Sequence, residues 1–365
     1  MSTKNCDTLE YMNRYRPIIY QQIFQILCSL SSIIIVFFGR LIQKPAYFHP
    51  NVKILIKLFQ FSVLIYSFNN SSAQLYHLLT AQIFENCEFL ISTRLCFPFR
   101  FLCTASVTGF CLFPFSIPIE RAIATKNLGK GYENRKANLG SFVGYCSIML
   151  SIGFSLFHHL PNLSIDVECD NCLFSTPPET VPQHLSIFGV ACSTVALVLT
   201  FSLLCYNRAQ LSRKTYSLSS EFQINQNLRI LHLGLPMSFL TFILFLLISV
   251  SEIYFQQEHE TMKENQEFIQ LRSWKMAQNL FPIYTVLCSL IWLAQMLYER
   301  KKRKLGNERL MASLAKKGDE RNVYFQTLQN QWAYPTNKRV STVLPRSTVP
   351  TVSSSQRVSL TDCKL

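Results

Sequence analysis

Seven long runs without Asp, Glu, Lys or Arg constrain this chain more than any other feature. A bilayer core of about 30 Å is crossed by about 20 apolar helical residues. The runs are continuous rather than alternating, and backbone groups in lipid must be hydrogen-bonded internally, so we expect helices and not a β-barrel. The predicted fold class is an all-α membrane protein, a seven-transmembrane helix bundle. The runs are Pro17–Gly39, Leu58–Phe84, Phe101–Ile119, Ala137–Ile165, Thr180–Asn207, Ile230–Ser251 and Met276–Tyr298.

The basic residues are divided unequally between the two sides of such a bundle. The net charge is +14, which in a soluble protein would suggest nucleic acid. Here one set of alternate segments holds 27 Lys and Arg and the other set holds 8, so the positive-inside rule predicts an outer N-terminus and a cytosolic C-terminus. No nucleic-acid partner is predicted. The basic segments are 40–57, 120–136, 208–229 and 300–365, and we refer to their side as the inner end.

The runs divide the chain into four parts. We predict an extracellular N-terminus over 1–17, a seven-transmembrane domain over 18–300, a basic juxtamembrane segment over 301–334 and a disordered Ser/Thr-rich cytoplasmic tail over 335–365. The cluster at 300–304 is expected to attract anionic membrane lipid. The segment at 218–229 has a weak helical pattern and is expected to extend the sixth helix inward.

Cysteines gather in the predicted outer segments, as an oxidising exterior would favour. Cys96 lies just before the third run, at the outer start of the third span, and Cys169 and Cys172 lie in the loop after the fourth. A Cys96–Cys169 or a Cys96–Cys172 bridge would fix this loop over the bundle, and Cys87 could pair with the remaining cysteine; reduced thiols are the alternative. Asn162, in Asn-Leu-Ser, is a candidate glycosylation site.

A charge pair ends the third run. Glu120 and Arg121 follow nineteen residues without an ionisable group, at the predicted inner end. An exposed pair of this kind contributes little, but a pair desolvated by neighbouring helices can act as a two-state element.

The runs also carry uncharged polar groups. Asn69 and Asn70 lie near the middle of the second run, where we favour packing contacts between helices over a hydrated cavity. Arg100, at the outer end of the third run, is expected to reach the headgroups in preference to the interior. No catalytic constellation, metal site or cofactor is predicted, because the runs lack carboxylates and Met276–Tyr298 has no lysine for a retinal Schiff base.

Three sequence stretches together resemble the nematode serpentine chemoreceptors, in the superfamily that groups classes alpha, ab, beta and epsilon, with class ab favoured. The similarity covers roughly residues 20–300. Glu221 and Gln226 depart from the group's pattern, which leaves the coupling through this loop open. The matching stretches are Glu120-Arg121-Ala122-Ile123-Ala124-Thr125 with Tyr132-Glu133, Leu218-Ser219-Ser220-Glu221-Phe222-Gln223 through Asn227-Leu228-Arg229, and Cys87 and Cys96 before Arg100.

This resemblance implies a chemosensory G-protein-coupled receptor. It implies a small-molecule chemical ligand outside, a heterotrimeric G protein inside and a place in the plasma membrane of sensory neurons or their cilia. The Ser/Thr-rich tail offers phosphorylation sites, so a kinase or arrestin is expected to act on it. Glu120, Arg121, Thr125 and Arg229 are then the expected activation or G-protein contacts. A seven-span transporter or a ligand-gated ion channel is the alternative, and it requires a continuous polar path between the helices.

Overall fold

Seven long helices make up the protein in the computed structural model, which describes residues 16–42, 49–83, 91–127, 138–160, 168–169, 180–212, 218–261 and 279–316. Each is long and apolar enough to cross a bilayer, so the predicted seven-helix fold class is confirmed. The order along the chain is α2 (Arg16–Ile42), α3 (Pro50–Ile83), β1 (Ile91–Ser92), α4 (Thr93–Lys126), α5 (Asn138–His159), β2 (Glu168–Cys169), α6 (Thr180–Ser212), α7 (Leu218–Thr261) and α9 (Phe281–Lys316).

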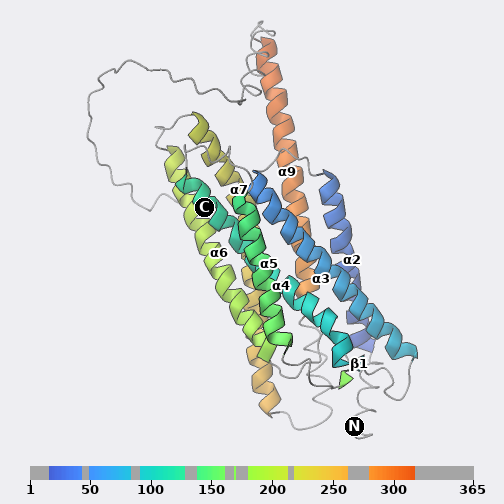
Figure 1. Ribbon diagram of the computed structural model, residues 1–365. Coiled ribbons are helices and arrows are strands. Elements are labelled where there is room, and N and C mark those ends of the chain that lie inside the picture. Colours follow the sequence, from blue (N-terminus) through green and yellow to red (C-terminus); the bar gives the residue numbers. More distant parts are fainter. Residues whose placement is uncertain are drawn as a thin grey trace. The chain divides into compact units, whose positions relative to one another are not determined.

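The chain forms two compact units, Met1–Met296 and Leu297–Leu365, so the boundary falls within α9. The first unit holds the bundle (Figure 1). In the second, α9 continues to Lys316, and its exposed Lys304–Glu308 pair, at 3.9 Å, adds little stability. The predicted N-terminal segment before Arg16 and the tail 335–365 lie outside the described residues.

All of these helices except α5 extend beyond the inner end of their apolar run, because the backbone can stay hydrogen-bonded after it leaves the lipid. The clearest case is α7, which begins at Leu218 and not at Ile230, as the predicted inward extension requires. The N-terminus of α4 is capped by Ser92, whose hydroxyl accepts a hydrogen bond from Arg94 N at 3.2 Å.

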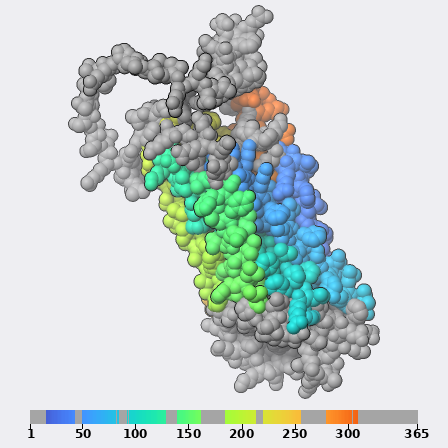
Figure 2. Space-filling model, viewed as in Figure 1, coloured from blue at the N-terminus to red at the C-terminus, as the bar shows by residue number. Residues whose placement is uncertain are grey.

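Helix α4 is the centre of the first unit. Its apolar stretch is 67% buried, against at most 44% for the other six, and it packs against α3, α5, α6 and α7. On the face seen in Figure 2, α5 lies between α3 and α6 and covers α4. Side chains at both ends of α4 can therefore contact several neighbouring helices at once.

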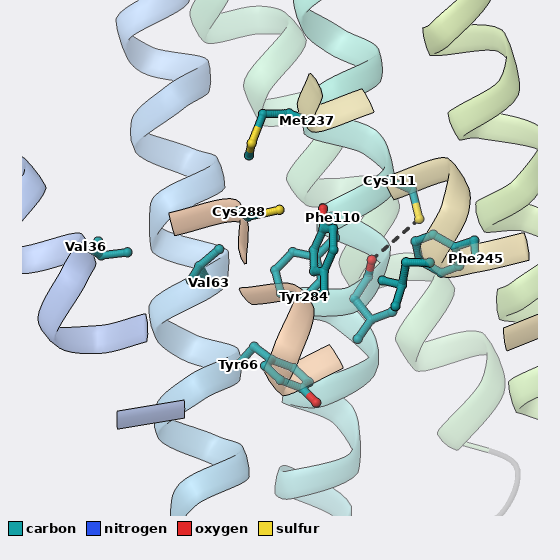
Figure 3. Packing of buried hydrophobic residues seen from close by; sticks show 11 residues of the cluster. Val36, Val63, Tyr66, Phe110, Cys111, Met237, Phe245, Tyr284 and Cys288 are labelled. Carbon is teal, nitrogen blue, oxygen red and sulfur yellow. Dashed lines mark hydrogen bonds between the residues drawn. The ribbon is translucent and has the colours of Figure 1, made fainter. Parts of the chain in front are cut away.

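An aromatic layer fills the middle of the bundle, formed by Tyr66, Phe110, Phe245, Phe281 and Tyr284. The Phe110 ring lies 5.6 Å from Tyr66 and 5.3 Å from Tyr284, and Phe281 lies 6.0 Å from Tyr66 and 5.8 Å from Phe245. These are tilted and edge-on contacts, which ring quadrupoles favour. Figure 3 shows side chains from α3, α4, α7 and α9 meeting here.

Candidate functional site: a buried network at the inner end

The Glu120–Arg121 pair lies on the last turns of α4 and is fully buried. Arg121 Nε donates to Glu120 Oε2 and Arg121 Nη2 to Glu120 Oε1, both at 2.5 Å. Adjacent residues on a helix do not normally face one another. Here both side chains turn into the bundle, and the residues are only 0% and 1% exposed. The result is a bidentate, desolvated ion pair, a type that is costly to break by removing one partner.

A third donor of Arg121 reaches a different helix. Arg121 Nη1 donates to Oδ1 of Asn227 on α7 at 2.8 Å, and Asn227 is buried. The sequence comparison included Asn227 in a matching stretch but did not single it out. The available signal was an amide three residues before the apolar run that starts at Ile230. This hydrogen bond joins α4 to α7 through a charged group.

Thr125, one helical turn beyond Arg121, connects three helices. Its Oγ1 accepts from Asn227 Nδ2 at 3.1 Å and from Asn207 Nδ2 on α6 at 3.4 Å. A hydroxyl oxygen has two lone pairs, so both bonds can form together. Asn207 also donates to Leu203 O at 2.8 Å on its own helix. The matching residue Thr125 therefore holds the inner ends of α6 and α7 against α4.

Asn51 carries the contacts to the other side of the bundle. Its Nδ2 donates to Glu120 Oε1 at 3.4 Å, and its Oδ1 accepts from Gly140 N on α5 at 3.1 Å. A Cβ on Gly140 would lie 2.4 Å from Asn51 Cα, so only glycine permits this approach of α5 to α3. We call Asn51, Glu120, Arg121, Thr125, Asn207 and Asn227 the inner network.

His49 lies just before α3 and next to this network. Its Nδ1 accepts a hydrogen bond from Asn51 N at 3.3 Å. Burial lowers the pKa of His49, the nearby Arg121 charge lowers it further, and Glu120 opposes this only in part. His49 therefore favours the neutral form beside the charge pair.

Arg229 has a different position from the other three expected residues. It is half-buried on α7, two residues beyond Asn227. The α7 contact to Arg121 is made by Asn227. The structure thus brings Glu120, Arg121 and Thr125 together, and a G-protein contact at Arg229 stays a prediction.

The outer end of α4 is fixed to the loop after α5. Ile91 and Ser92 pair antiparallel with Cys169 and Glu168, so the backbone of Cys169 lies opposite Ile91. Cys96 is fully buried and disulfide-bonded. Its pairing with Cys169 or Cys172 stays a prediction, because the Cys169 side chain and Cys87, Cys172 and Asn162 lie outside the described residues.

Two residues of α4 and α6 differ from expectation. Arg100 is only 7% exposed, so the preferred interpretation that it reaches the headgroups is wrong. One helical turn beyond Arg100, Thr104 Oγ1 and His159 Nε2 on α5 form a hydrogen bond at 2.8 Å. Cys205, on the inner half of α6, is also disulfide-bonded, which the distribution of cysteines does not predict.

Within the described ranges, no three His, Cys, Asp or Glu side chains are grouped so that they could hold a metal ion. The inner network consists of one ion pair, one hydroxyl and three amides, and these groups can bind, release and reorient a guanidinium. They do not place a nucleophile beside a base, as covalent catalysis needs.

The comparisons with known proteins identify the family of this chain. The sequence model of the family described as "Serpentine type 7TM GPCR receptor class ab chemoreceptor" matches residues 3–333. The chain is also similar to serpentine receptor class beta-16 of Caenorhabditis elegans, with 24% identity over 303 residues, 78% of this chain and 83% of that protein. The chain therefore belongs to the family of serpentine seven-transmembrane G-protein-coupled chemoreceptors of class ab.

Proposed function

We propose that this chemosensory G-protein-coupled receptor transmits the binding of an external small molecule by releasing Arg121 from the inner network. The observation that carries the proposal is the contact of one buried guanidinium with two helices. It bonds Glu120 on its own helix and Asn227 on α7. When α7 moves away from α4, Arg121 keeps its carboxylate partner and gains a free donor for the G-protein α subunit.

The energetics support a switch at Asn227 in preference to Glu120. Removing one partner of a buried ion pair costs roughly 3–5 kcal/mol, whereas a hydrogen bond to a charged group contributes about 1.5–3 kcal/mol. The Arg121–Asn227 bond is therefore the weaker of the two, and it is the one that crosses between helices. A ligand that prefers an inner-open bundle by a few kcal/mol can supply this difference.

A membrane transporter or ion channel is the weaker alternative. Such a protein needs polar groups continuous along the bundle. On α3, the network residue Asn51, the aromatic-layer residue Tyr66 and the polar residue Gln74 follow in that order. Rings of the aromatic layer thus lie between Asn51 and Gln74, which favours a receptor that passes a conformational change over a solute path.

The surroundings of the bundle complete the proposal. We place the receptor in the plasma membrane of sensory neurons or their cilia, with the N-terminus outside and the C-terminus inside. The basic residues 300–304 would contact anionic lipid, and the Ser/Thr-rich tail would receive a kinase and an arrestin. An N-terminal epitope should bind antibody on intact cells, and an epitope that is reached only after permeabilisation would reverse the orientation.

The test of the Arg121 role needs no known ligand. Asn227→Leu should raise basal guanine-nucleotide exchange on a co-expressed G protein, because it removes the α7 partner of Arg121. Adding Arg121→Ala to Asn227→Leu should return exchange to the level of cells without receptor. Arg40→Ala in the same background is the matched control, because Arg40 is an exposed inner-end arginine of α2 bonded to Gln60 Oε1.

Surface expression of every variant is measured in parallel with an extracellular tag. Exchange that stays high in the double variant, at equal surface expression, would contradict the assigned role of Arg121. Exchange lost with Arg40→Ala as well would mean that the inner arginines act only through their charge.

A further inference from the structure

A second polar cluster lies between α2, α3 and the start of α9, on the far side of the aromatic layer from the inner network. We call Gln25, Ser29, Asn70, Gln74 and Asn279 the polar seam. Asn51 and Gln74 are separated by roughly 35 Å along α3, from the helical rise per residue. The seam therefore belongs to the half of the bundle predicted to face outward.

The bonds of the polar seam use the N–H groups of its amides. Asn70 Nδ2 donates to Ser29 Oγ at 3.0 Å, and Gln74 Nε2 donates to Gln25 Oε1 at 2.9 Å. Asn279 Nδ2 also donates to Gln25 Oε1, at 3.3 Å, and Asn279 Oδ1 accepts from the Tyr66 hydroxyl at 3.3 Å. Amide donors thus connect both α3 and the start of α9 to α2.

Some acceptor oxygens in and beside the seam have no hydrogen-bond donor. Asn70 Oδ1, Gln74 Oε1 and the nearby Ser67 Oγ have no hydrogen-bond partner among the described residues. Residues 67, 70 and 74 share one face of α3, and all three are 0% exposed. Each such atom costs about 1–3 kcal/mol when it stays unpartnered, and lipid offers it no substitute.

The chemistry of these atoms defines what would bind them. The two amide oxygens can only accept hydrogen bonds, so a matching molecule must donate through a hydroxyl or an N–H. The five seam residues are all uncharged, so an ion placed there would lack a compensating partner. The rings of Tyr66 and Phe281 lie beside the seam, 6.0 Å apart, and offer an apolar surface.

We propose that the polar seam is a binding subsite for a small neutral molecule that carries a hydroxyl or amide N–H on an apolar body, such as an alcohol. The molecule's donor would reach Gln74 Oε1, and its apolar part would contact Tyr66 and Phe281. The inference rests on the proposed function for the meaning of such a ligand, but its test does not involve the G protein.

The test compares alcohols with carbonyl compounds of the same carbon skeleton. Cyclohexanol is paired with cyclohexanone and benzyl alcohol with benzaldehyde, and binding to the purified full-length receptor in lipid nanodiscs is measured by calorimetry and by thermal unfolding. Each carbonyl compound keeps the size of its partner but lacks the donor. We expect at least one alcohol to bind roughly fivefold more tightly than its partner, as one hydrogen bond of about 1 kcal/mol predicts.

Gln74→Met is the informative variant, because it keeps the length of the side chain and removes the acceptor. It should abolish the preference for the alcohol, whereas Gln82→Met, at an exposed position of the same helix, should leave it unchanged. Equal binding of alcohol and carbonyl compound in both pairs would overturn the proposal. A preference that survives in Gln74→Met would also overturn it, because the alcohol would then be recognised by a different acceptor.

The two proposals can fail separately. Loss of the alcohol preference leaves the Arg121 experiment untouched, because that experiment uses basal nucleotide exchange. High nucleotide exchange in the double variant Asn227→Leu with Arg121→Ala would contradict the proposed activation route. It would not affect the binding of alcohols at the seam, which is measured directly.

Discussion

The inner network and the polar seam are two buried polar clusters of similar size. They differ in charge and in the number of buried polar atoms without a hydrogen-bond partner. The network contains a full charge pair, and Asn207 Oδ1 is the one atom of its six side chains without a partner among the described residues. The seam has no charge, and two of its amide oxygens lack partners, although they are just as buried. A closed, partnered cluster is suited to hold a state, whereas a cluster with unused acceptors is suited to receive a group.

The largest effect is expected at the charge pair. Glu120→Ala leaves the Arg121 guanidinium buried without its carboxylate, so the free energy of unfolding in detergent should fall by roughly 3–5 kcal/mol. The double variant Glu120→Gln with Arg121→Gln removes both charges and should be much closer to the wild type. If Glu120→Ala unfolds like the wild type, the network does not stabilise the closed bundle.

The next effect concerns the close approach of α3 and α5. Gly140→Ala places a Cβ against the Asn51 backbone and displaces the helix that donates to Asn51 Oδ1. We expect a loss of about 1–3 kcal/mol in unfolding free energy. Gly153→Ala on the same helix meets nothing within 4 Å and should be tolerated. Equal stability of the two variants would contradict the observed packing.

Asn227→Leu tests whether the network holds the inactive state. Asn227→Leu removes the hydrogen bond from Arg121 and the one to Thr125 Oγ1. The first, to a charged group, contributes about 1.5 kcal/mol, so the active population and basal nucleotide exchange should rise at least roughly tenfold. Asn225→Leu, an exposed amide on the same helix, is the control and should leave exchange unchanged. Exchange that stays at the wild-type level in Asn227→Leu would move the switch elsewhere.

A smaller, pH-dependent effect should come from His49. Its pKa is lowered in the folded protein, whereas the unfolded chain has the ordinary value of about 6.5. The unfolded state then binds the proton more readily, so stability should fall as the pH falls through about 6.5. His49→Gln should remove this part of the slope in unfolding measured from about pH 8 to about pH 5. An unchanged slope would assign it to other groups.

The smallest effect is expected in the polar seam. Gln74→Met removes one hydrogen bond to Gln25 but also an oxygen that has no partner, so the two changes should nearly cancel, to within about 1 kcal/mol. Thermal unfolding without added alcohol measures this directly. A loss as large as that of Glu120→Ala would show that the seam, like the network, is mainly structural.

Much of this molecule could be predicted from its sequence, and the reason is the bilayer. Continuous apolar runs satisfy their backbone in lipid most simply as helices, so the seven spans follow from the apolar runs. The inward extension of α7 was predicted from the helical pattern of residues 218–229. The charge pair at Glu120 and Arg121 was recognisable because a charge at the end of an apolar run is costly. The sequence did not show whether each polar side chain faces the bundle interior or the lipid headgroups, and the expectation for Arg100 was therefore wrong.

The order of residues is enough to predict the seven helices, the charge pair and the resemblance to the receptor family. It does not predict the partners of the polar side chains, which depend on how the helices pack. Asn227, and not Arg229, contacts Arg121, because the two residues point in different directions around the α7 axis. Asn227 faces α4, whereas Arg229 is half-buried. Asn51 meets Glu120 from another helix, and Asn70 and Gln74 keep unused oxygens. Such contacts join residues far apart in the chain, so they depend on how the helices pack and not on any local pattern.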